Sequence, residues 1–283
     1  MHQIYVEDSI ADHERTRGIL QRFPRAHVTR LEHYGSVFNR KAQNFRLQKK
    51  SPALILAHKQ GKRILPAPPG YGVGGAHNYY FSHMLNCPYY CRYCFLQGMY
   101  RSANYVLFVN YEDFKQDIRQ QIASNDGETS WFFSGYDCDS LAYEPVSHFA
   151  QEFLPLFSEG TAWLELRSKS TQVRSLLQQS VQSNVVVAFS LSPDAISQAL
   201  EHGAPSLDKR LQAIQAVQKH GWKIGLRFDP IIYDPDYKNL YRDFFQQTFK
   251  RLDSEAIHSA SLGAFRLPRN FFQNMPRLYP EEA

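Results

Sequence analysis

Apolar and polar positions follow one another along the second half of the chain in a pattern that predicts strands and helices in turn. Short apolar runs predict buried strands, whereas longer segments with apolar residues three or four positions apart predict amphipathic helices. An extended segment at 105–109 is followed by a helix that begins after Asn110, a favoured N-cap residue. The pattern then predicts strands at 131–133, 162–166, 185–190, 223–228 and 257–262, with helices at 146–157, 173–179, 207–220 and 239–252.

The segment 207–220 has the clearest helical pattern, with an apolar stripe of Leu207, Leu211, Ile214 and Val217. Strands that alternate with helices of this length predict βα units and a parallel sheet, either as a partial barrel or as a doubly wound sheet. In both architectures the active site lies at the carboxyl ends of the strands. The fold class expected from the pattern is therefore α/β.

The first quarter of the chain predicts a small α/β lobe of its own, which ends at a stretch rich in proline and glycine. Residues 66–75 (PAPPGYGVGG) cannot continue a helix or a strand ladder, so we interpret them as a linker. We expect an N-terminal lobe at 1–75 and a main domain at 76–283. The lobe's predicted elements are strands at 4–6, 27–31, 53–57 and 64–65 and a helix at 12–23.

The amino-acid composition limits the classes of protein to which the chain can belong. The chain has 283 residues, 43% of them hydrophobic, which suffices for a substantial core. No apolar run approaches the eighteen or so residues of a membrane span, and the N-terminus lacks a signal-peptide pattern. Four cysteines are too few for a disulfide framework, and their clustering favours metal in a reducing compartment. We expect a cytoplasmic monomer with no membrane association.

Positive charge is concentrated near the N-terminus. Residues 1–80 contain 13 Lys and Arg against 5 Asp and Glu, a net of +8, and the remainder contains 19 against 22, a net of −3. There is no acidic residue between Glu32 and Glu112. Such a segment could present a basic face to a polyanion such as nucleic acid, or it could be a solvated loop with incidental lysines.

Three of the four cysteines lie within eight residues, in the spacing C-x3-C-x2-C at Cys87, Cys91 and Cys94. Three thiolates from one loop suit an iron–sulfur cluster, which usually takes four cysteines, so that one iron would be left for a ligand other than protein. The alternative is a structural zinc site with Cys138 as its fourth thiolate. Zinc sites usually pair two C-x2-C units, however, and here the distal cysteine stands alone.

With an aromatic residue after its last cysteine, this motif resembles the signature of radical S-adenosylmethionine enzymes. The resemblance implies a partial (β/α)6 barrel with the small N-terminal α/β lobe added. It also implies a [4Fe–4S] cluster held by the three cysteines, with S-adenosylmethionine chelating the fourth iron. An electron from the cluster then cleaves S-adenosylmethionine to a 5′-deoxyadenosyl radical, so a reducing electron donor of the flavodoxin or ferredoxin type is expected.

Within that superfamily the chain most resembles the spore photoproduct lyase family, and the likeness runs through almost all of it. The resemblance implies reversal of a thymine photoproduct in DNA, with DNA or another nucleic acid as the substrate. The stretches that carry it are 91–97 (CRYCFLQ), 138–140 (CDS), 164–170 (LELRSKS), 189–193 (FSLSP), 221–232 (GWKIGLRFDPII) and 262–266 (LGAFR).

The resemblance also implies roles for single residues. Cys138, with Ser140 two positions on, matches a cysteine that donates a hydrogen atom to the substrate radical, although a lone cysteine is commonly a small core residue. Tyr93 resembles one member of a tyrosine pair that relays the radical back to the adenosine. Phe95 stands where the family has the second tyrosine, and it has no O–H, although its ring could still stack on adenine.

Four further residues match positions near bound S-adenosylmethionine. Lys169 would meet a carboxylate or hydroxyl, although it could also be a solvated cation beyond a strand, and Ser190 would bind the ribose. Ser134 and Gly135 follow a strand after which the superfamily holds the methionine amino group with backbone atoms. Charged residues in the buried strand 223–228 and just after it, Arg227 and Asp229, must be paired or must face the site.

Two departures bear on the substrate. One is Phe95, and the other is that the sequence stops at Ala283, before the aromatic and glycine-rich hairpin that the family inserts at the lesion. Two other readings therefore stay open. The chain could be a radical enzyme that acts on a modified nucleotide, a nucleic-acid fragment or a peptide, or it could be a nucleic-acid-binding protein with a structural metal site and no catalysis.

Overall fold

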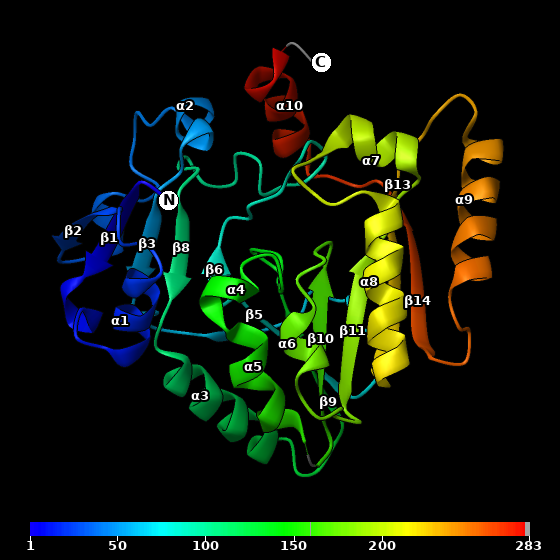
Figure 1. Ribbon diagram of the computed structural model, residues 1–283, viewed down its shortest axis with the longest axis horizontal. Coiled ribbons are helices and arrows are strands. Elements are labelled where there is room, and N and C mark those ends of the chain that lie inside the picture. Colours follow the sequence, from blue (N-terminus) through cyan, green and yellow to red (C-terminus); the bar gives the residue numbers. More distant parts are fainter. Residues whose placement is uncertain (159, 281–283) are drawn as a thin grey trace.

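The structure, a computed structural model, describes residues 1–158 and 160–280 and contains two mixed sheets that lie side by side (Figure 1). The smaller sheet has the strand order β2-β1-β3-β8-β6, in which the first four strands are parallel and β6 is antiparallel to β8. Its strands are β1 (Gln3–Glu7), β2 (His27–Leu31), β3 (Leu54–Ala57), β6 (Met84–Leu85) and β8 (Tyr105–Phe108).

The larger sheet has the order β14-β13-β11-β10-β9-β5-β4, and all its strands are parallel except β4 at one edge. Both β14 and β4 are edge strands, so the sheet is open in the part of the chain that the structure describes. Its strands are β4 (Ile64–Pro66), β5 (His77–Phe81), β9 (Ser130–Ser134), β10 (Ala162–Ser168), β11 (Val185–Ser190), β13 (Lys223–Ile231) and β14 (Ile257–Ala264).

Helices cover one face of the larger sheet, as α5, α6 and α8 do in front of β10 and β11 in Figure 1. A two-stranded pair, β7 (Tyr90–Cys91) and β12 (Glu201–His202), lies apart from both sheets. The helices are α1 (Glu14–Gln21), α2 (Phe45–Lys50), α3 (Tyr111–Ser124), α4 (Glu144–Ser147), α5 (Phe149–Phe153), α6 (Arg174–Leu177), α7 (Asp194–Leu200), α8 (Leu207–His220), α9 (Tyr237–Arg251) and α10 (Arg269–Leu278), with 3₁₀ turns at Asp8–Ile10, Tyr34–Ser36 and Leu154–Phe157.

Side chains alternate between the two faces of the larger sheet, and this alternation separates its core from its chemistry. In β10, Leu164 and Leu166 join the helix-covered core, so Glu165 and Arg167 project from the opposite face. Likewise Phe132 of β9 belongs to that core, while Trp131 and Phe133 form a separate cluster on the other side. The face away from the helices is therefore the one that carries charged and aromatic groups.

The predicted alternation of strands and helices and the parallel sheet are confirmed. The predicted helix at 146–157 is wrong in detail, because His148 adopts a left-handed conformation (φ +50°) and divides it into α4, α5 and a 3₁₀ turn. The Glu144 carboxylate accepts the backbone N–H groups of Ala150 and Gln151 (2.8 and 3.3 Å) and so caps the new helix start. The pattern did not predict α2, α7, α10 or the strand β5.

The two sheets do not separate at residue 75. Strand β4 precedes that residue and pairs with β5 in the larger sheet, whereas β6 and β8 follow it and belong to the smaller one. The stretch 66–75 therefore leads from β4 into a hairpin partner rather than from one sheet to the other. The division into 1–75 and 76–283 as separate domains stays a prediction.

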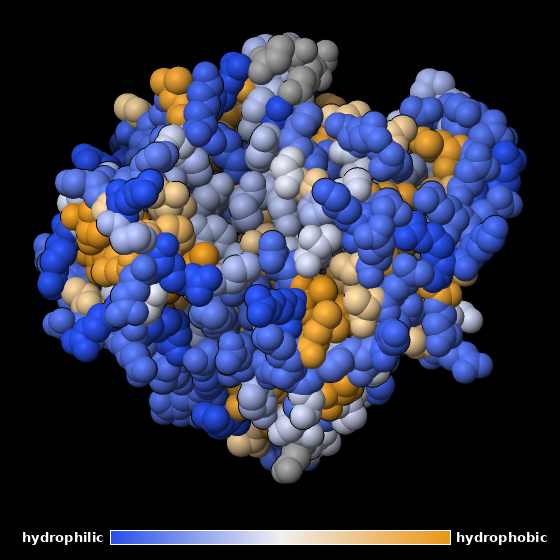
Figure 2. Space-filling view, in the orientation of Figure 1, coloured by the Kyte–Doolittle hydropathy of each residue, from blue (hydrophilic) through white to orange (hydrophobic). Residues whose placement is uncertain are grey.

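One finding concerns helices that could span a membrane. No helix among the described residues is both long and apolar enough to cross a bilayer. In Figure 2, hydrophobic residues on the visible face form small separate patches among mainly hydrophilic ones.

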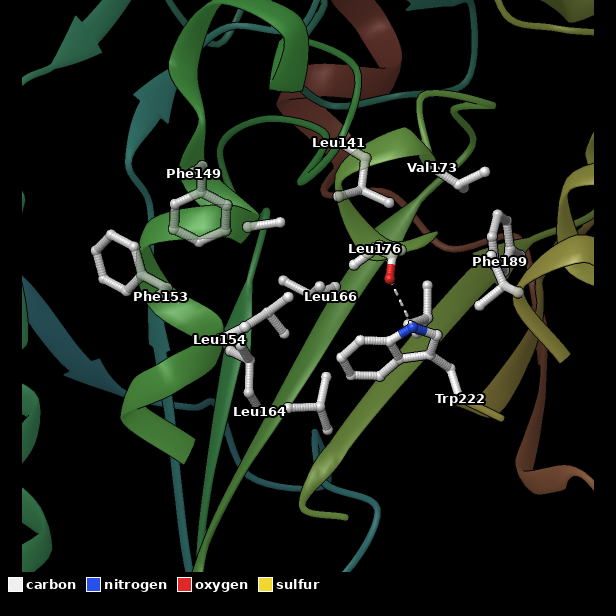
Figure 3. Close-up of a cluster of buried hydrophobic side chains, with 14 of the residues drawn as sticks. Leu141, Phe149, Phe153, Leu154, Leu164, Leu166, Val173, Leu176, Phe189 and Trp222 are labelled. Carbon is white, nitrogen blue, oxygen red and sulfur yellow. Dashed lines mark hydrogen bonds between the residues drawn. The ribbon is translucent and has the colours of Figure 1, made fainter. Parts of the chain in front are cut away.

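The core between the larger sheet and its helices is closed by Trp222, which is 1% exposed. Its indole N–H donates to the carbonyl oxygen of Leu176 (3.0 Å), and this bond ties the start of β13 to α6 (Figure 3). The ring packs among apolar side chains that include Leu164, Leu166 and Phe189. Loss of the indole would remove packing and leave a buried carbonyl without this donor.

We predict that Trp222→Phe lowers the free energy of unfolding by roughly 2–3 kcal/mol, measured by urea denaturation. Trp163→Phe is the matched control, because Trp163 is only partly buried and stacks on Trp131 at 4.9 Å. We expect the control to lose clearly less. Equal losses in the two variants would contradict the assignment of Trp222 to the closure of this core.

Candidate functional site

The candidate site is a cavity of about 380 Å³ at the carboxyl ends of the parallel strands. Residues at or just beyond the carboxyl ends of β9, β10, β11, β13 and β14 line one side of it, and the cysteine loop lines the other. This is the location expected for an α/β fold of this type. Nine of the eleven site residues predicted from the sequence line the cavity: Cys87, Cys91, Cys94, Tyr93, Phe95, Gly135, Cys138, Lys169 and Ser190.

The cysteine loop is held in place by contacts from distant parts of the chain. Strand β7 pairs with β12, which sets Cys91 opposite Glu201, and the backbone N–H of Arg92 donates to the carbonyl of Leu200 (2.8 Å). On the other side the Lys49 ammonium of α2 donates to the carbonyl of Cys87 (2.9 Å). These contacts from β12 and α2 therefore hold the loop on both sides.

The three cysteines fit an iron–sulfur cluster, because the bound metal itself deprotonates the thiols that coordinate it. Cys91 is buried, and Cys87 and Cys94 are partly exposed. Burial raises the pKa of the Cys91 thiol to about 12 and also raises the pKa of Cys87 and Cys94. Bound metal deprotonates such thiols, and the nearby Lys49 and Lys169 ammonium groups favour the resulting thiolates.

Within residues 1–158 and 160–280, no three His, Cys, Asp or Glu side chains are arranged as ligands of one metal ion. A [4Fe–4S] cluster does not require this arrangement, because each of its cysteines binds a different iron. Cys138, the fourth ligand of the zinc alternative, lines the same cavity but also has contacts of its own. Its sulfur lies 3.9 Å from Nδ1 of His83, and its side chain packs in the core cluster of the smaller sheet.

A buried carboxylate that the sequence analysis missed lies beneath the loop. Glu201 accepts hydrogen bonds from the hydroxyl of Tyr93 and the guanidinium of Arg210, and its carboxylate is 3.4 Å from the Lys169 ammonium. Burial by itself raises the pKa of Glu201, but the charges of Lys169 and Arg210 and the hydrogen bonds lower it to about 2. Ser192 and Ser197 also donate to it, at 3.1 and 3.0 Å.

A second buried carboxylate organises the opposite wall. Glu165 accepts hydrogen bonds from Arg167 (2.8 Å) and Arg227 (2.6 Å), which confirms that Arg227 is paired. Burial opposes ionisation of Glu165, yet the two guanidinium groups hold its pKa below the usual value. Arg167 also donates to the hydroxyl of Tyr71 (2.7 Å), so residue 71 of the expected linker forms part of the cavity wall.

Two predicted site residues do not reach the cavity. The hydroxyls of Ser134 and Ser140 are 2.7 Å apart and fully buried behind Gly135. Gly135 has φ +80°, and a Cβ there would lie 2.6 Å from the Ser140 hydroxyl, so the turn needs glycine. The two serines thus support the turn from behind, and a direct cofactor contact by either stays a prediction.

Two acidic residues, Asp139 and Asp229, also line the cavity. Asp139 is buried and accepts the backbone N–H of Lys169 (2.7 Å) and the hydroxyl of Ser168 (2.7 Å), which fixes the loop after β9 against the end of β10. Asp229 lines the cavity, as the strand pattern had suggested. A Cβ at Gly263 would lie 2.5 Å from its carboxylate, so only glycine leaves room for Asp229 there.

Three of the basic residues between Glu32 and Glu112 have contacts within the protein. Lys49 points to the cysteine loop, Arg63 is paired with Asp117 (2.8 Å), and Arg92 lies 3.6 Å from the ring centre of Tyr279. Others are exposed to solvent, namely Arg40, Lys41, Arg46, Lys50, Lys62 and Arg101. Contact of this segment with nucleic acid stays a prediction.

Signals for the missed residues were present in the sequence. Arg210 is three residues after Leu207, within the apolar stripe of α8, and a buried arginine demands a carboxylate partner. Glu165 stands between two leucines of a buried strand in the same way. Nothing in the sequence indicated which partner each would have, because Glu201 and Arg227 are brought to them only by the fold.

A comparison with protein families matches residues 75–273 to the family model described as spore photoproduct lyase. The spore photoproduct lyase of Bacillus subtilis (strain 168) is 24% identical over 174 residues, 61% of this chain and 51% of the relative. That of Geobacillus sp. (strain Y412MC61) is 26% identical over 170 residues, 59% of this chain and 50% of the relative. The matches thus span about half the length of these curated relatives.

Solved structures of similar fold include a spore photoproduct lyase mutant with bound AdoMet and dinucleoside spore photoproduct. It has a TM-score of 0.86 and 17% identity, and the match covers 99% of this chain and 83% of that one. Spore photoproduct lyase complexed with dinucleoside spore photoproduct gives the same values. At this identity the structures establish a shared mixed α/β fold.

We predict that Glu201→Gln lowers the free energy of unfolding at neutral pH by roughly 3–5 kcal/mol, because Lys169 and Arg210 lose their buried counter-charge. The wild-type carboxylate stabilises the folded state above its ordinary pKa of 4.5, and this contribution is lost as pH falls toward about 2. The difference between wild type and variant in urea denaturation should therefore shrink over that range.

Glu128→Gln is the control for this experiment, since the Glu128 side chain is 61% exposed and its partner is His77 on the surface. We expect a change of less than about 0.5 kcal/mol for it. If Glu201→Gln behaved like the control, or if its effect were independent of pH, a charged Glu201 would not stabilise this site.

Proposed function

Because this chain belongs to the spore photoproduct lyase family, we propose that it is a radical S-adenosylmethionine lyase that reverses a thymine photoproduct in DNA. The observation that carries the proposal is that the three cysteines of the C-x3-C-x2-C motif and the distal Cys138 line one cavity. A cofactor site and a hydrogen donor would thus face the same substrate. The match to about half of the relatives' length makes the whole activity a proposal rather than a finding.

The proposed cofactors are a [4Fe–4S] cluster on Cys87, Cys91 and Cys94 and S-adenosylmethionine beside it. When bound, the pair supplies a 5′-deoxyadenosyl radical that abstracts hydrogen from the substrate. A related structure holds AdoMet in the same fold, which supports this assignment. Lys49 and Lys169 offset the negative charge of the cluster ligands.

The walls of the cavity would position S-adenosylmethionine. The backbone at Gly135 is held by the Ser134–Ser140 pair and presents polar atoms at the end of β9. Lys169 reaches the cavity from the end of β10 and Ser190 from the end of β11, so they can bind a carboxylate and a ribose hydroxyl. The ring of Phe95, 5.7 Å from that of Tyr136, provides an apolar surface for the adenine.

Cys138 is proposed to end the reaction by donating its hydrogen atom to the product radical. The S–H bond breaks, a C–H bond forms, and the unpaired electron remains on sulfur. Burial, and then the charges of Asp137 and Asp139, hold the pKa of Cys138 well above its usual value, so the hydrogen is present at neutral pH. Tyr93, whose hydroxyl now donates to Glu201, is the one relay tyrosine of the family's pair that this chain keeps.

The proposal also covers the barrel architecture, the location and oligomeric state of the protein, its electron donor and its substrate. The open sheet, with its six parallel strands in chain order, is interpreted as the partial (β/α)6 barrel of radical S-adenosylmethionine enzymes. The protein would act as a cytoplasmic monomer and receive electrons from a flavodoxin or ferredoxin. The fold's relatives in complex with dinucleoside spore photoproduct support a nucleic-acid substrate.

The test is anaerobic reconstitution with iron and sulfide, followed by dithionite and S-adenosylmethionine. We expect a brown protein that releases 5′-deoxyadenosine and restores thymines in an oligonucleotide carrying the photoproduct. Cys91→Ala should abolish the chromophore. Formation of 5′-deoxyadenosine without repair would favour a radical enzyme with another substrate, and a colourless protein that holds one zinc would overturn both enzyme assignments.

We predict that Cys138→Ala leaves 5′-deoxyadenosine formation intact but diverts the product radical into by-products, because the variant lacks the S–H hydrogen. Product identity is measured by chromatography and mass spectrometry of the repaired oligonucleotide. Ser192→Ala is a suitable control, since its hydroxyl contacts Glu201 rather than the cavity. An unchanged product pattern in Cys138→Ala would make Cys138 a core residue only.

A further inference from the structure

A fully buried histidine lies against the distal cysteine. His83, between β5 and β6, is 0% exposed, and its Nδ1 is 3.9 Å from the sulfur of Cys138, within reach of a weak sulfur hydrogen bond. Its other ring nitrogen, Nε2, is buried and has no hydrogen-bond partner among the residues that the structure describes. A buried imidazole with one nitrogen unsatisfied is costly, so its presence here requires a reason.

The imidazole ring has a fixed orientation. It stacks on the ring of Phe149 with centroids 3.8 Å apart and planes only 6° from parallel, and Tyr111 meets it edge-on at 6.5 Å. The backbone is fixed as well, because the carbonyl of His83 accepts the backbone N–H of Phe108 (3.0 Å). The rings of Phe149 in α5 and Tyr111 in α3 therefore hold Nδ1 toward Cys138.

The unpartnered nitrogen identifies the tautomer. Burial lowers the pKa of His83 to about 3, so the ring is neutral and carries one N–H. If the hydrogen were on Nε2, a buried N–H donor would have no acceptor, which is rarer in proteins than an acceptor without a donor. The hydrogen is therefore on Nδ1, and Nδ1–H donates to the sulfur of Cys138.

We propose that His83 is a positioning residue, which holds the sulfur of Cys138 so that the thiol hydrogen points into the cavity. The inference rests on the proposed role of Cys138 as hydrogen donor. The backbone N–H of Met84 also lowers the pKa of this thiol against the effect of burial, so two successive residues act on the sulfur. An S–H bond that donates to neither of them can point into the cavity, which Cys138 lines.

His83 makes or breaks no bond in this scheme. It donates no proton and carries no charge, and the hydrogen atom that moves is the one on sulfur. Its contribution is to select one orientation of the S–H bond before the substrate radical forms, which favours transfer to carbon over side reactions. Cys138 is the catalytic residue, and His83 acts through it.

The first test does not depend on catalysis. The S–H stretching band of Cys138 is identified in the infrared spectrum of the full protein as the band that Cys138→Ala removes. We expect the narrow, high-frequency band of a thiol that donates no hydrogen bond. His83→Leu should shift or broaden it, because the thiol can then rotate, while His83→Asn, whose amide N–H can replace Nδ1–H, should restore it. The ¹⁵N shifts of His83 in wild type should report hydrogen on Nδ1.

The second test uses the repair assay. His83→Leu should raise the fraction of by-product about three- to tenfold while 5′-deoxyadenosine formation stays unchanged, as expected for loss of one hydrogen bond. His83→Asn should lie close to wild type. His148→Asn is the control, because His148 lies on the surface between α4 and α5.

The results distinguish an error in the role inferred for His83 from an error in the proposed function. A broad, low-frequency band in wild type, or hydrogen on Nε2, would mean that the thiol donates to His83 and would overturn the inference. A by-product fraction unchanged in His83→Leu would also overturn it. Failure of wild type to repair the photoproduct, with the expected infrared and ¹⁵N results, would overturn the proposed function instead. If His83→Leu does not fold, the ¹⁵N measurement on wild type still decides the tautomer.

Discussion

The site depends on one electrostatic constraint, which is that buried carboxylates must be compensated within the fold. Glu201 is compensated by Arg210 from α8 and Lys169 from the end of β10, and it sits in β12, the strand that pairs with the cysteine loop. A buried charge of this kind is costly unless each partner is in place. The position of the loop, the register of α8 and the end of β10 are therefore fixed together, and the cavity is what lies between them.

Glu165 applies the same constraint on the other side of the cavity. It joins Arg167 in its own strand to Arg227 two strands away, and Arg167 in turn holds Tyr71 of the proline- and glycine-rich stretch. Because side chains alternate along β10, Glu165 and Arg167 lie on the face that the helices leave uncovered. Leu164 and Leu166 of the same strand lie on the other face and pack in the core. One strand thus serves stability on one face and the site on the other.

Local patterns predicted the strands, the helices and the clustered cysteines, because each depends on residues close in sequence. Spacing also identified most of the cavity wall, since carboxyl ends of parallel strands converge in space. Pairing between distant segments was not predictable: four of the five residues of β5 are only partly buried, and this segment becomes a strand by pairing with β9. Helix α7 has only seven residues, and α10 contains Pro276, a residue that normally interrupts a helix. For the same reason the hydrogen bond between the hydroxyls of Ser134 and Ser140 behind Gly135 could not be predicted.

The smaller sheet has a consequence for how this protein could be reduced in size. Cys138 follows a strand of the larger sheet, yet its side chain packs in the core of the smaller one, and Lys49 of the same lobe binds the cysteine loop. A shortened protein that kept only the larger sheet and its helices would keep all four cysteines but would lose the packing around Cys138 and the Lys49 hydrogen bond to the cysteine loop. The smallest unit that keeps the contacts of Cys138 and of the cysteine loop therefore includes the smaller sheet and α2.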